Sequence, residues 1–481
     1  MAVLEHLKPQ KVFYFFEQLC GIPHGSGNVE QISNYLVDFA KERGFEYIQD
    51  EVKNVIIIKE ASVGYENVPA LMIQGHMDMV AVKEADCQID MAKEGLQLRI
   101  DGDLISAEGT SLGGDDGIAV AYALALLDDD SISHPRLEVV LTVDEETGME
   151  GASAIDLSML QAKRMLNIDS EEEGILLTGC AGGVRAACKL PLRRCAKTGL
   201  AYKVTITGLQ GGHSGIEIHK ERGNSNCLMG RMLYCLLDRI SYDILDIAGG
   251  VADNAVPANT SAMIVIEEKD AEAFEAFAME YEAVLQKELQ TKDPGVRIEY
   301  DKMVVETYQV LTKETKEKAV RMLFMAPNGV QAMNADIPGL VQTSLNLGIL
   351  SMQEAEMILD YSVRSSVTSE KKWLVSRLSA LTETFGGSLA LSGDYPAWEF
   401  RKDSALLQVM VEIYEAMYGK KPEVQTVHAG MECGILSEKI DNLDCVSFGP
   451  DMKDIHTPKE VLSISSTQRV WEYLVEVVKR K

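Results

Sequence analysis

The sequence contains few cysteines, and no two of them form a Cys-x-x-Cys pair. Nine cysteines are scattered over 481 residues. Their odd number and irregular spacing argue against a disulfide framework, and this usage indicates a reducing compartment. Residues 1–9 also lack a charged segment followed by an apolar one. We therefore expect no signal peptide and a cytoplasmic location.

Long apolar runs and an excess of basic residues are absent as well. The best candidate for a membrane span, residues 118–127, is shorter than the roughly 18 residues required and is interpreted as a buried helix. The chain carries 46 lysines and arginines against 74 aspartates and glutamates, a net charge of −28. Such acidity excludes nucleic acid and anionic membranes as expected partners. It is compatible with the binding of divalent cations.

Helical and strand-like patterns alternate in the first third of the chain. Apolar residues recur at helical spacing over 12–19 and 32–39, whereas 54–58, 70–74 and 137–143 are strand-like. Strands that are apolar on both faces and are separated by helices predict a mostly parallel sheet flanked by helices. The predicted fold class is therefore α/β.

The pattern changes near residues 185–200, where basic residues cluster and half-exposed strands begin. The later helix and strand units predict an inserted α+β domain. A hinge-like segment at 393–398 precedes two helices that would complete the first domain. We predict a discontinuous catalytic domain and one insert, divided as 1–186, 187–394 and 395–481.

Histidines and carboxylates follow the strand-like runs or stand in Gly-rich turns. There are seven such candidates: His76, Asp78, Asp115, Glu145, Glu146, Asp169 and His456. In open α/β sheets, sites form at the carboxyl ends of strands, so these side chains can converge on one crevice. Two histidines with several carboxylates are ligands that borderline-hard divalent ions prefer. The pattern predicts a two-metal hydrolase.

Each motif alone has an ordinary structural explanation. A single aspartate after a strand is commonly a helix cap, and a Glu-Glu pair commonly faces solvent. We favour the metal site because the motifs occur together, in order, after successive strands.

The spacing also indicates how the residues divide their roles. His76 and Asp78 point to one side of an extended segment, so Asp78 can hold the second ring nitrogen of a metal-binding His76. Glu145 and Glu146 point to opposite sides if their segment is extended. One of them can then bind metal while the other acts as a general base.

These motifs resemble those of the co-catalytic zinc peptidases, a family that includes carboxypeptidase G, aminoacylases and cytosolic dipeptidases. The resemblance covers nearly the whole chain. Longer strings resemble the aminoacyl-histidine dipeptidase branch, which cleaves Xaa-His dipeptides such as β-Ala-His. They lie at 166–174, 211–220 and 428–434.

The resemblance implies two divalent metal ions bridged by Asp115, with zinc first and cobalt or manganese accepted by the same ligands. One ion would be bound by His76 and Asp169, and the other by Glu146 and His456. Glu145 would be the general base and Asp78 would orient His76. The resemblance also implies a cis peptide after Asp115.

The inserted domain would act as a lid and could form a homodimer interface. The resemblance implies that His213 stabilises the oxyanion, that Arg364 clamps the substrate carboxylate, and that Asn254 lies near the substrate. Ordinary alternatives are a turn residue for His213 and a surface ion pair for Arg364. The neighbouring His219 has no assigned role.

Two residues of the Gly-rich 428–434 string, His428 and Glu432, are expected to line the substrate pocket. The Glu432 carboxylate could hold a substrate ammonium group. A broader dipeptidase, a tripeptidase and an N-acyl-amino-acid amidohydrolase remain alternatives on the same scaffold. A non-catalytic metal-binding protein is the alternative from a different class, and it would be expected to lack a ligand or the base.

Overall fold

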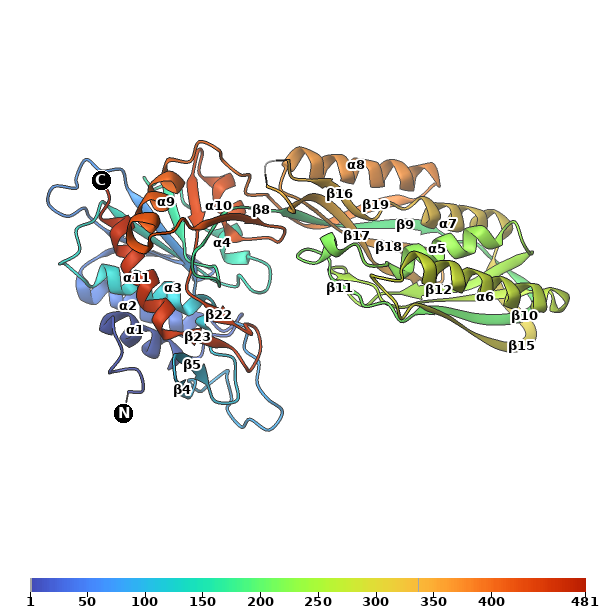
Figure 1. Ribbon diagram of the computed structural model, residues 1–481, viewed down its shortest axis with the longest axis horizontal. Helices are drawn as coiled ribbons and strands as arrows, with labels where there is room; N and C mark the ends of the chain where they lie inside the picture. Colours follow the sequence, from blue (N-terminus) through green and yellow to red (C-terminus); the bar gives the residue numbers. More distant parts are fainter. Residues whose placement is uncertain (1, 336) are drawn as a thin grey trace. The chain divides into compact units, whose positions relative to one another are not determined.

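The computed structural model describes residues 2–335 and 337–481, which form two compact units (Figure 1). Unit 1 comprises Met1–Cys180, Trp398–Thr426 and Met431–Lys481, and unit 2 comprises Ala181–Ala397 and Val427–Gly430. The predicted limits at 186/187 and 394/395 lie within a few residues of these unit limits. The short segment 427–430 belongs to unit 2, although it was predicted to lie in the second part of the catalytic domain.

Unit 1 is built on an eight-stranded sheet of order β1-β2-β6-β3-β7-β21-β8-β20. Its central strands β6, β3, β7 and β21 run parallel, whereas β1, β2 and β8 pair antiparallel with their neighbours. The parallel sheet is thus confirmed for the centre and not for the flanking strands. The strand bounds are β1 Glu46–Gln49, β2 Val55–Lys59, β3 Leu71–His76, β6 Leu137–Thr142, β7 Arg164–Asn167, β8 Ile175–Cys180, β20 Glu423–Val427 and β21 Asp444–Ser447.

Helices pack on this sheet and bury one hydrophobic core. Every residue of α3 is buried, which explains the apolar run seen at 118–127. Two helices end at a glycine in the left-handed conformation, α2 at Gly44 and α9 at Gly419. The helices are α1 Gln10–Cys20, α2 Glu30–Arg43, α3 Gly114–Leu127, α4 Glu150–Ala154, α9 Ala405–Tyr418, α10 Glu432–Lys439 and α11 Ile464–Val478.

A small second sheet of unit 1 has the order β22-β23-β5-β4. It joins residues near position 100 to the C-terminal part of the chain. Its strands are β4 Leu98–Asp101, β5 Leu104–Ala107, β22 Met452–Lys453 and β23 Val461–Ser463.

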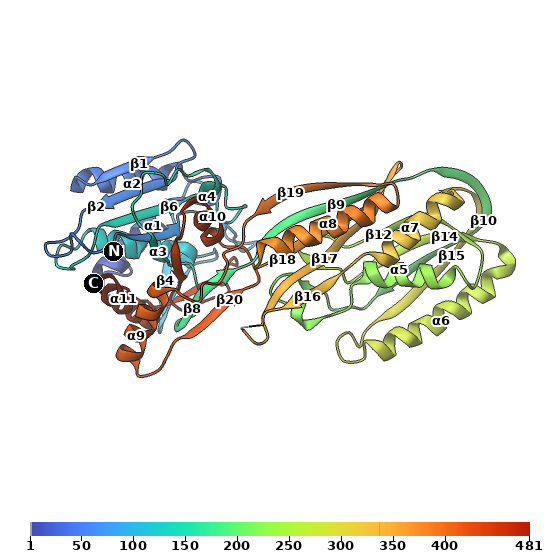
Figure 2. The same cartoon turned by 90° about the horizontal axis from the view of Figure 1, so that it is seen from above.

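Unit 2 is an antiparallel sheet of order β15-β10-β14-β12-β17-β18-β9-β19, with β16 beside β17 and helices along it (Figure 2). Alternate strand residues face the helices, as Val184, Ala186 and Cys188 do. The strands are β9 Gly182–Pro191, β10 Arg194–Thr207, β12 Tyr242–Gly249, β14 Thr260–Ile266, β15 Arg297–Leu311, β16 Gly329–Met333, β17 Val341–Met352, β18 Glu356–Ser365 and β19 Ser388–Tyr395. The helices are α5 Ser225–Leu236, α6 Ala271–Glu288, α7 Lys313–Met325 and α8 Thr368–Thr384.

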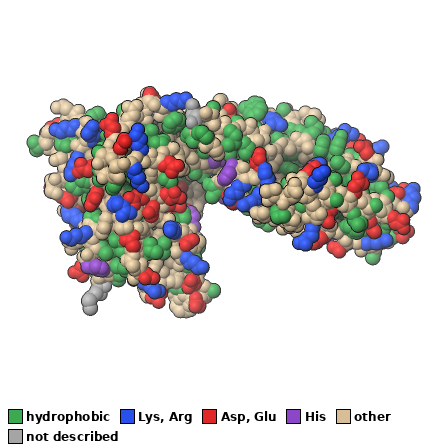
Figure 3. Space-filling view, in the orientation of Figure 1, with side chains coloured by type: hydrophobic (Ala, Val, Ile, Leu, Met, Phe, Trp, Pro, Cys, Tyr) green, Lys and Arg blue, Asp and Glu red, His purple; other side chains and the backbone are tan. Residues whose placement is uncertain are grey.

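Acidic and basic side chains are interspersed over the face shown in Figure 3. Within the described part of the chain, no helix is both long and apolar enough to cross a membrane.

Candidate metal centre

The carboxyl ends of three central strands carry the candidate site in unit 1. β3 ends at His76, and β7 ends two residues before Asp169. β6 ends at Thr142, just before the turn that contains Glu145 and Glu146. Because parallel strands end at one edge of the sheet, residues far apart in sequence meet there.

Asp115 lies between the two histidines of this site. Its Oδ1 atom is 3.2 Å from His76 Nε2, and its Oδ2 atom is 3.2 Å from His456 Nε2. His456 Nε2 is also 2.9 Å from Glu146 Oε1, while His76 Nε2 is 3.8 Å from Asp169 Oδ1. The structure therefore brings all five candidate ligands together, with one carboxylate between two imidazoles.

Among the described residues, three groups of side chains could hold a metal ion, because the donor atoms within each group lie within 4.8 Å of one another. One group, Asp115, Glu146 and His456, has the composition predicted for the second ion. Another contains Asp116 with His76 and Asp169, where Asp115 was expected. The third consists of His76, Glu145 and Glu146.

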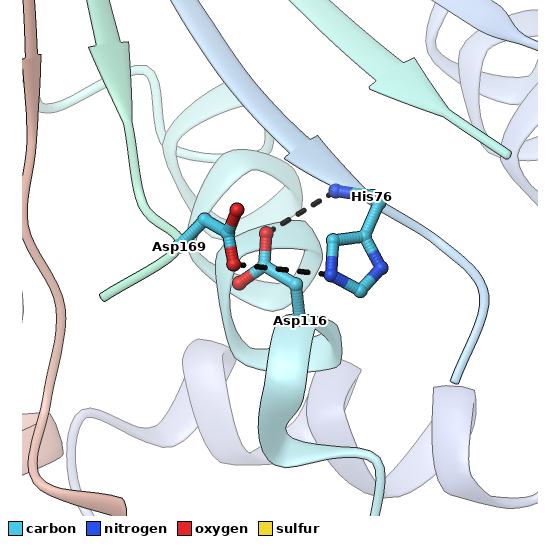
Figure 4. A group of neighbouring side chains, drawn as sticks. All are labelled: His76, Asp116 and Asp169. Carbon is cyan, nitrogen blue, oxygen red and sulfur yellow. Dashed lines mark hydrogen bonds and ion pairs between the residues drawn. The ribbon is translucent and has the colours of Figure 1, made fainter. Parts of the chain in front are cut away.

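Figure 4 shows why Asp116 approaches His76. Asp116 Oδ2 accepts a hydrogen bond of 3.2 Å from the backbone N–H of His76, while the ring faces Asp169. Asp116 thus holds the end of β3, and Asp115 remains the carboxylate that contacts both histidine rings. The peptide bond between these two aspartates is cis, as the resemblance implied.

Asp78 anchors both His76 and the turn that carries Glu145. His76 Nδ1 is 3.0 Å from the backbone oxygen of Asp78 and 3.5 Å from its Oδ1 atom. The Asp78 carboxylate accepts hydrogen bonds from the backbone N–H of Glu145 (3.1 Å) and from Ser26 Oγ (2.8 Å). The second ring nitrogen of His76 is therefore closer to the Asp78 carbonyl than to the expected carboxylate.

Glu145 and Glu146 do not form an extended segment, so the condition for their predicted opposite directions is not met. Asp144 has a positive φ of 53°, and the backbone N–H of Met149 donates to the carbonyl oxygen of Glu145 (2.9 Å). A carboxylate oxygen of each glutamate lies within 4.8 Å of the other and of a His76 ring nitrogen. The turn places both side chains at one centre.

The histidines of the site are surrounded by negative charge. Hydrogen bonds to Asp115 and Glu146 raise the pKa of His456 to about 10. Burial would lower the pKa of His76, but its hydrogen bonds to Asp115 and Asp78 outweigh that effect and raise the pKa well above its ordinary value. Both shifts show that this site favours positive charge.

The carboxylates show the same excess of negative charge. Burial raises the pKa of Glu145 to about 8, and Glu432 and Glu146 add to the effect. Burial, with Asp115 and Glu145 nearby, holds the pKa of Asp169 well above its ordinary value. Two histidines therefore do not neutralise the cluster.

These residues fit two divalent cations. The donor set of imidazole nitrogens and carboxylate oxygens suits zinc and related ions. Two buried carboxylate oxygens of this cluster, Asp116 Oδ1 and Glu432 Oε1, have no hydrogen-bond partner. Since buried charged oxygens are normally satisfied by a donor, a metal ion or water, the cluster has room for positive ligands.

Four of the predicted substrate-binding or oxyanion residues lie in unit 2. His213 stands in the two-residue strand β11, Gly212–His213, which pairs with β13, Ala255–Val256, directly after Asn254. The Nδ1 atom of His213 accepts backbone N–H bonds from Gly215 (3.1 Å) and Ile216 (3.2 Å). Its proton is therefore carried by Nε2.

Besides burial, Arg364 lowers the pKa of two histidines of unit 2, His213 and His428. Its Nη1 atom donates to the Tyr395 hydroxyl (2.9 Å), and its buried Nε has no partner. Burial and then Arg364 lower the pKa of His213, and the same causes lower that of His428 to about 3. His428 Nε2 lies 2.8 Å from Ser344 Oγ. The structure thus gathers an arginine and two neutral histidines.

Glu432, the first residue of α10, is fully buried in unit 1. Its Oε2 atom accepts hydrogen bonds from Gln74 Nε2 (2.5 Å) and Thr142 Oγ1 (2.7 Å). Because the side chain has no exposed surface, this geometry supports a buried structural role more directly than contact with a substrate. The substrate-binding role stays a prediction.

The sequence did not predict a role for Asp116, or for two polar strand residues that come shortly before proposed ligands. Gln74 and Asn167 lie two residues before His76 and Asp169, and Asn167 Nδ2 donates to Gln74 Oε1 (2.6 Å). A period of two in a strand was the available signal, because i and i−2 face the same side. His219, for which no role was predicted, is exposed.

The fold and the site define a peptidase-like hydrolase scaffold with a candidate dinuclear metal centre. The chain belongs to peptidase family M20/M25/M40, and the sequence model of that family matches residues 72–480.

Full-length relatives agree with this assignment. The chain is 36% identical over 482 residues to the cytosol non-specific dipeptidase of Escherichia coli, with 100% of this chain and 99% of the relative covered. The crystal structure of aminoacylhistidine dipeptidase from Vibrio alginolyticus has a TM-score of 0.93 and 34% identity, covering 99% of this chain and 97% of that one. Aminopeptidase PepT from Bacillus cereus has a TM-score of 0.56 at 14% identity, with 98% of each chain covered, which shows the fold alone.

Proposed function

We propose that this protein is a dipeptidase that uses two divalent metal ions to hydrolyse Xaa-His dipeptides such as β-Ala-His. The observation that carries the proposal is the Asp115 carboxylate, with one oxygen 3.2 Å from each of two histidine rings. The names of two full-length relatives, both dipeptidases, support the substrate class.

The proposed ligands divide into two sets around Asp115. His76 and Asp169 would hold one ion, and Glu146 and His456 the other. When bound, such ions polarise the substrate carbonyl and lower the pKa of water. Zinc is the proposed native metal, although cobalt and manganese suit the same donors.

Glu145 is the proposed general base. Its carboxylate would accept a proton from the attacking water and then deliver it to the nitrogen of the leaving amine. Burial raises the pKa of Glu145 to about 8, and a base that titrates near neutral pH both accepts and returns a proton efficiently. Asp78 would keep this glutamate in place through its hydrogen bond to the Glu145 backbone.

Unit 2 would supply the groups that recognise the substrate. His213, with its proton on Nε2, would donate to the developing oxyanion. Arg364 would bind the substrate carboxylate, since its buried Nε has no partner within the protein. Asn254 and His428 would line the same site, and unit 2 would act as the lid.

A broader dipeptidase is the second candidate, and a specific finding favours it. The Escherichia coli relative is a non-specific dipeptidase, whereas the Vibrio relative is an aminoacylhistidine dipeptidase. Tripeptidase and N-acyl-amino-acid amidohydrolase activities are further alternatives. A non-catalytic role is disfavoured, because the ligand candidates and Glu145 are all present and gathered.

A substrate panel separates these candidates. The purified protein, loaded with zinc, cobalt or manganese, is assayed with β-Ala-His, Gly-His, Ala-Ala, a tripeptide and an N-acetyl amino acid. We expect metal-dependent cleavage of dipeptides, fastest for those ending in histidine. Comparable rates for Ala-Ala would favour the broad enzyme, and cleavage of only the acylated substrate would contradict a dipeptidase.

We also propose a cytoplasmic location and a homodimer formed through unit 2. The nine free cysteines support a reducing compartment. β15 lies at a sheet edge and exposes Met303, Val304 and Val305, and an unpaired edge can pair with a second copy. Light scattering should report a dimer for the wild type and a monomer for Val304→Lys. A monomeric wild type would contradict this.

A further inference from the structure

The structure assigns Glu460 a positioning role: its buried carboxylate holds residues 112–115 and thereby fixes Asp115 relative to His456. This inference rests on the proposed two-metal site, which needs Asp115 between two ions. Glu460 itself contacts none of the proposed ligand side chains and is therefore a positioning residue.

The carboxylate of Glu460 accepts hydrogen bonds from four consecutive backbone N–H groups. Its Oε2 atom accepts from Leu112 (2.8 Å) and Gly113 (3.1 Å), and its Oε1 atom accepts from Gly114 (2.8 Å) and Asp115 (3.4 Å). Only 3% of the side chain is exposed. Successive N–H groups of this kind form a concave site for an anion, and here the chain's own carboxylate fills it.

The glycines of this segment make the close approach possible. Gly113 has φ of 68°, and a Cβ there would lie 2.8 Å from Met79 Sδ. A Cβ on Gly114 would lie 3.1 Å from Met452 Sδ and 3.3 Å from Glu460 Oε1. The Gly-rich turn before Asp115 therefore encloses the carboxylate of Glu460, which lies 345 residues after Asp115 in the sequence.

Glu460 also belongs to the segment that carries His456. Both lie between β22 and β23, and the backbone N–H of Glu460 donates to the Thr457 carbonyl oxygen (3.2 Å). The His456 side chain is 44% exposed, so packing restrains it little. The Glu460 hydrogen bonds therefore link the segment of one ligand to the segment of the other.

We expect loss of this link to weaken metal binding more than it weakens the fold. In Glu460→Gln, the amide nitrogen cannot accept a hydrogen bond, so two of the four N–H groups lose their acceptor. Asp115 can then shift relative to His456, and the ion held by His456 and Glu146 should be affected most.

Glu138 offers a matched control in the same unit. It is also fully buried and accepts backbone N–H bonds from Gln161 (3.0 Å) and Ala162 (2.9 Å), with Arg136 Nε at 2.9 Å. It stands near the start of β6, at the opposite end from Glu145. Glu138→Gln should disturb folding similarly without touching the ligand segments.

The test is a cobalt titration of metal-free full-length protein, followed by visible absorption and by competition with a chelator. Wild type and Glu138→Gln should bind two Co²⁺ per chain with similar affinities. Glu460→Gln should bind one of the two Co²⁺ ions at least tenfold less tightly, with an altered cobalt spectrum. Wild-type affinities and spectrum in Glu460→Gln would overturn the inference.

Gly114→Ala provides a second variant if Glu460→Gln does not fold, since it crowds the same carboxylate by one methyl group. It should weaken cobalt binding in the same direction, and unchanged binding would again overturn the inference. The dipeptide panel is read separately. Two tightly bound ions without hydrolysis in the wild type would contradict the proposed function and leave the Glu460 role standing.

Discussion

The two units surround the histidines of the candidate site with opposite charge. In unit 1, His76 and His456 contact carboxylates, which raise the pKa of each ring. In unit 2, burial and Arg364 lower the pKa of His213 and of His428. Histidine is thus surrounded by carboxylates at the candidate metal centre, whereas in unit 2 it is held neutral near an arginine.

The folds of the units explain this difference. Parallel strands in unit 1 end at one edge, where acidic residues from separate loops gather. Unit 2 is an antiparallel sheet, and Arg364 lies within strand β18, where strand pairing fixes its position. The proposed hydrolysis of dipeptides would use both environments, since the reacting carbonyl gains negative charge and a dipeptide also carries a free carboxylate.

The largest expected effect comes from removing the base in unit 1. Glu145→Gln should lower kcat by about 10²–10⁴-fold, because proton transfer contributes on that order. The metal content, measured by elemental analysis, should stay at the wild-type value. Substantial residual kcat with full metal content would exclude Glu145 as the base.

Removing the negative charge of Asp115 should weaken the binding of metal ions instead. Asp115→Asn should lose at least one of two bound Zn²⁺ ions after dialysis against metal-free buffer, because an amide is a weaker ligand for zinc than a carboxylate. Asp169→Asn is the matched comparison, since it should affect only the ion near His76. Retention of two ions in Asp115→Asn would show that this residue does not bridge.

In unit 2, Arg364→Ala should raise KM for dipeptides by roughly 10–150-fold, the equivalent of a charged hydrogen bond of about 1.5–3 kcal/mol. The discriminating control is a substrate with an amidated C-terminus. The wild type should prefer the free acid, and the variant should treat the acid and the amide alike. A preference that survives the substitution would place the carboxylate elsewhere.

The last prediction concerns pH, the neutral histidine of unit 2 and stability alone. The folded-state pKa of His428, about 3, lies below its ordinary value. Between those values the unfolded chain binds a proton that the folded protein does not, so stability falls as the pH falls. From pH 6.5 to 4.5 this contributes about 2–3 kcal/mol.

Urea unfolding of metal-free protein at pH 7 and 4.5 checks this contribution. His428→Gln should lose less stability on acidification than the wild type does, whatever its stability at pH 7. Equal losses in both proteins would mean that His428 is not held neutral.

The sequence predicted best where the site follows from strand ends. His76, Glu146 and Asp169 could be found because each stands at or shortly after the end of an apolar strand, and β-sheet geometry then brings them together. Asp116 and Glu460 could not, since their roles depend on hydrogen bonds to backbone groups from other segments. The orientation of Glu145 was missed for a local reason: the strand ends at Thr142, and a turn replaces the extended segment.

For the fold, the sequence predicted the strands but not the direction in which they pair. Runs such as Val55–Lys59 signal a buried strand, but burial on both faces does not distinguish a parallel neighbour from an antiparallel one, and β2 is antiparallel to β6. The assignment of 427–430 to unit 2 depends on contacts such as His428 with Ser344, which no local pattern encodes.

Anomalous scattering from crystals grown with zinc tests the central claim most directly. Two zinc peaks about 3.5–4 Å apart, a usual spacing for two-metal sites, should flank the Asp115 carboxylate, with His76 beside one and His456 beside the other. A single peak, or two peaks that share no carboxylate, would contradict this account of the protein.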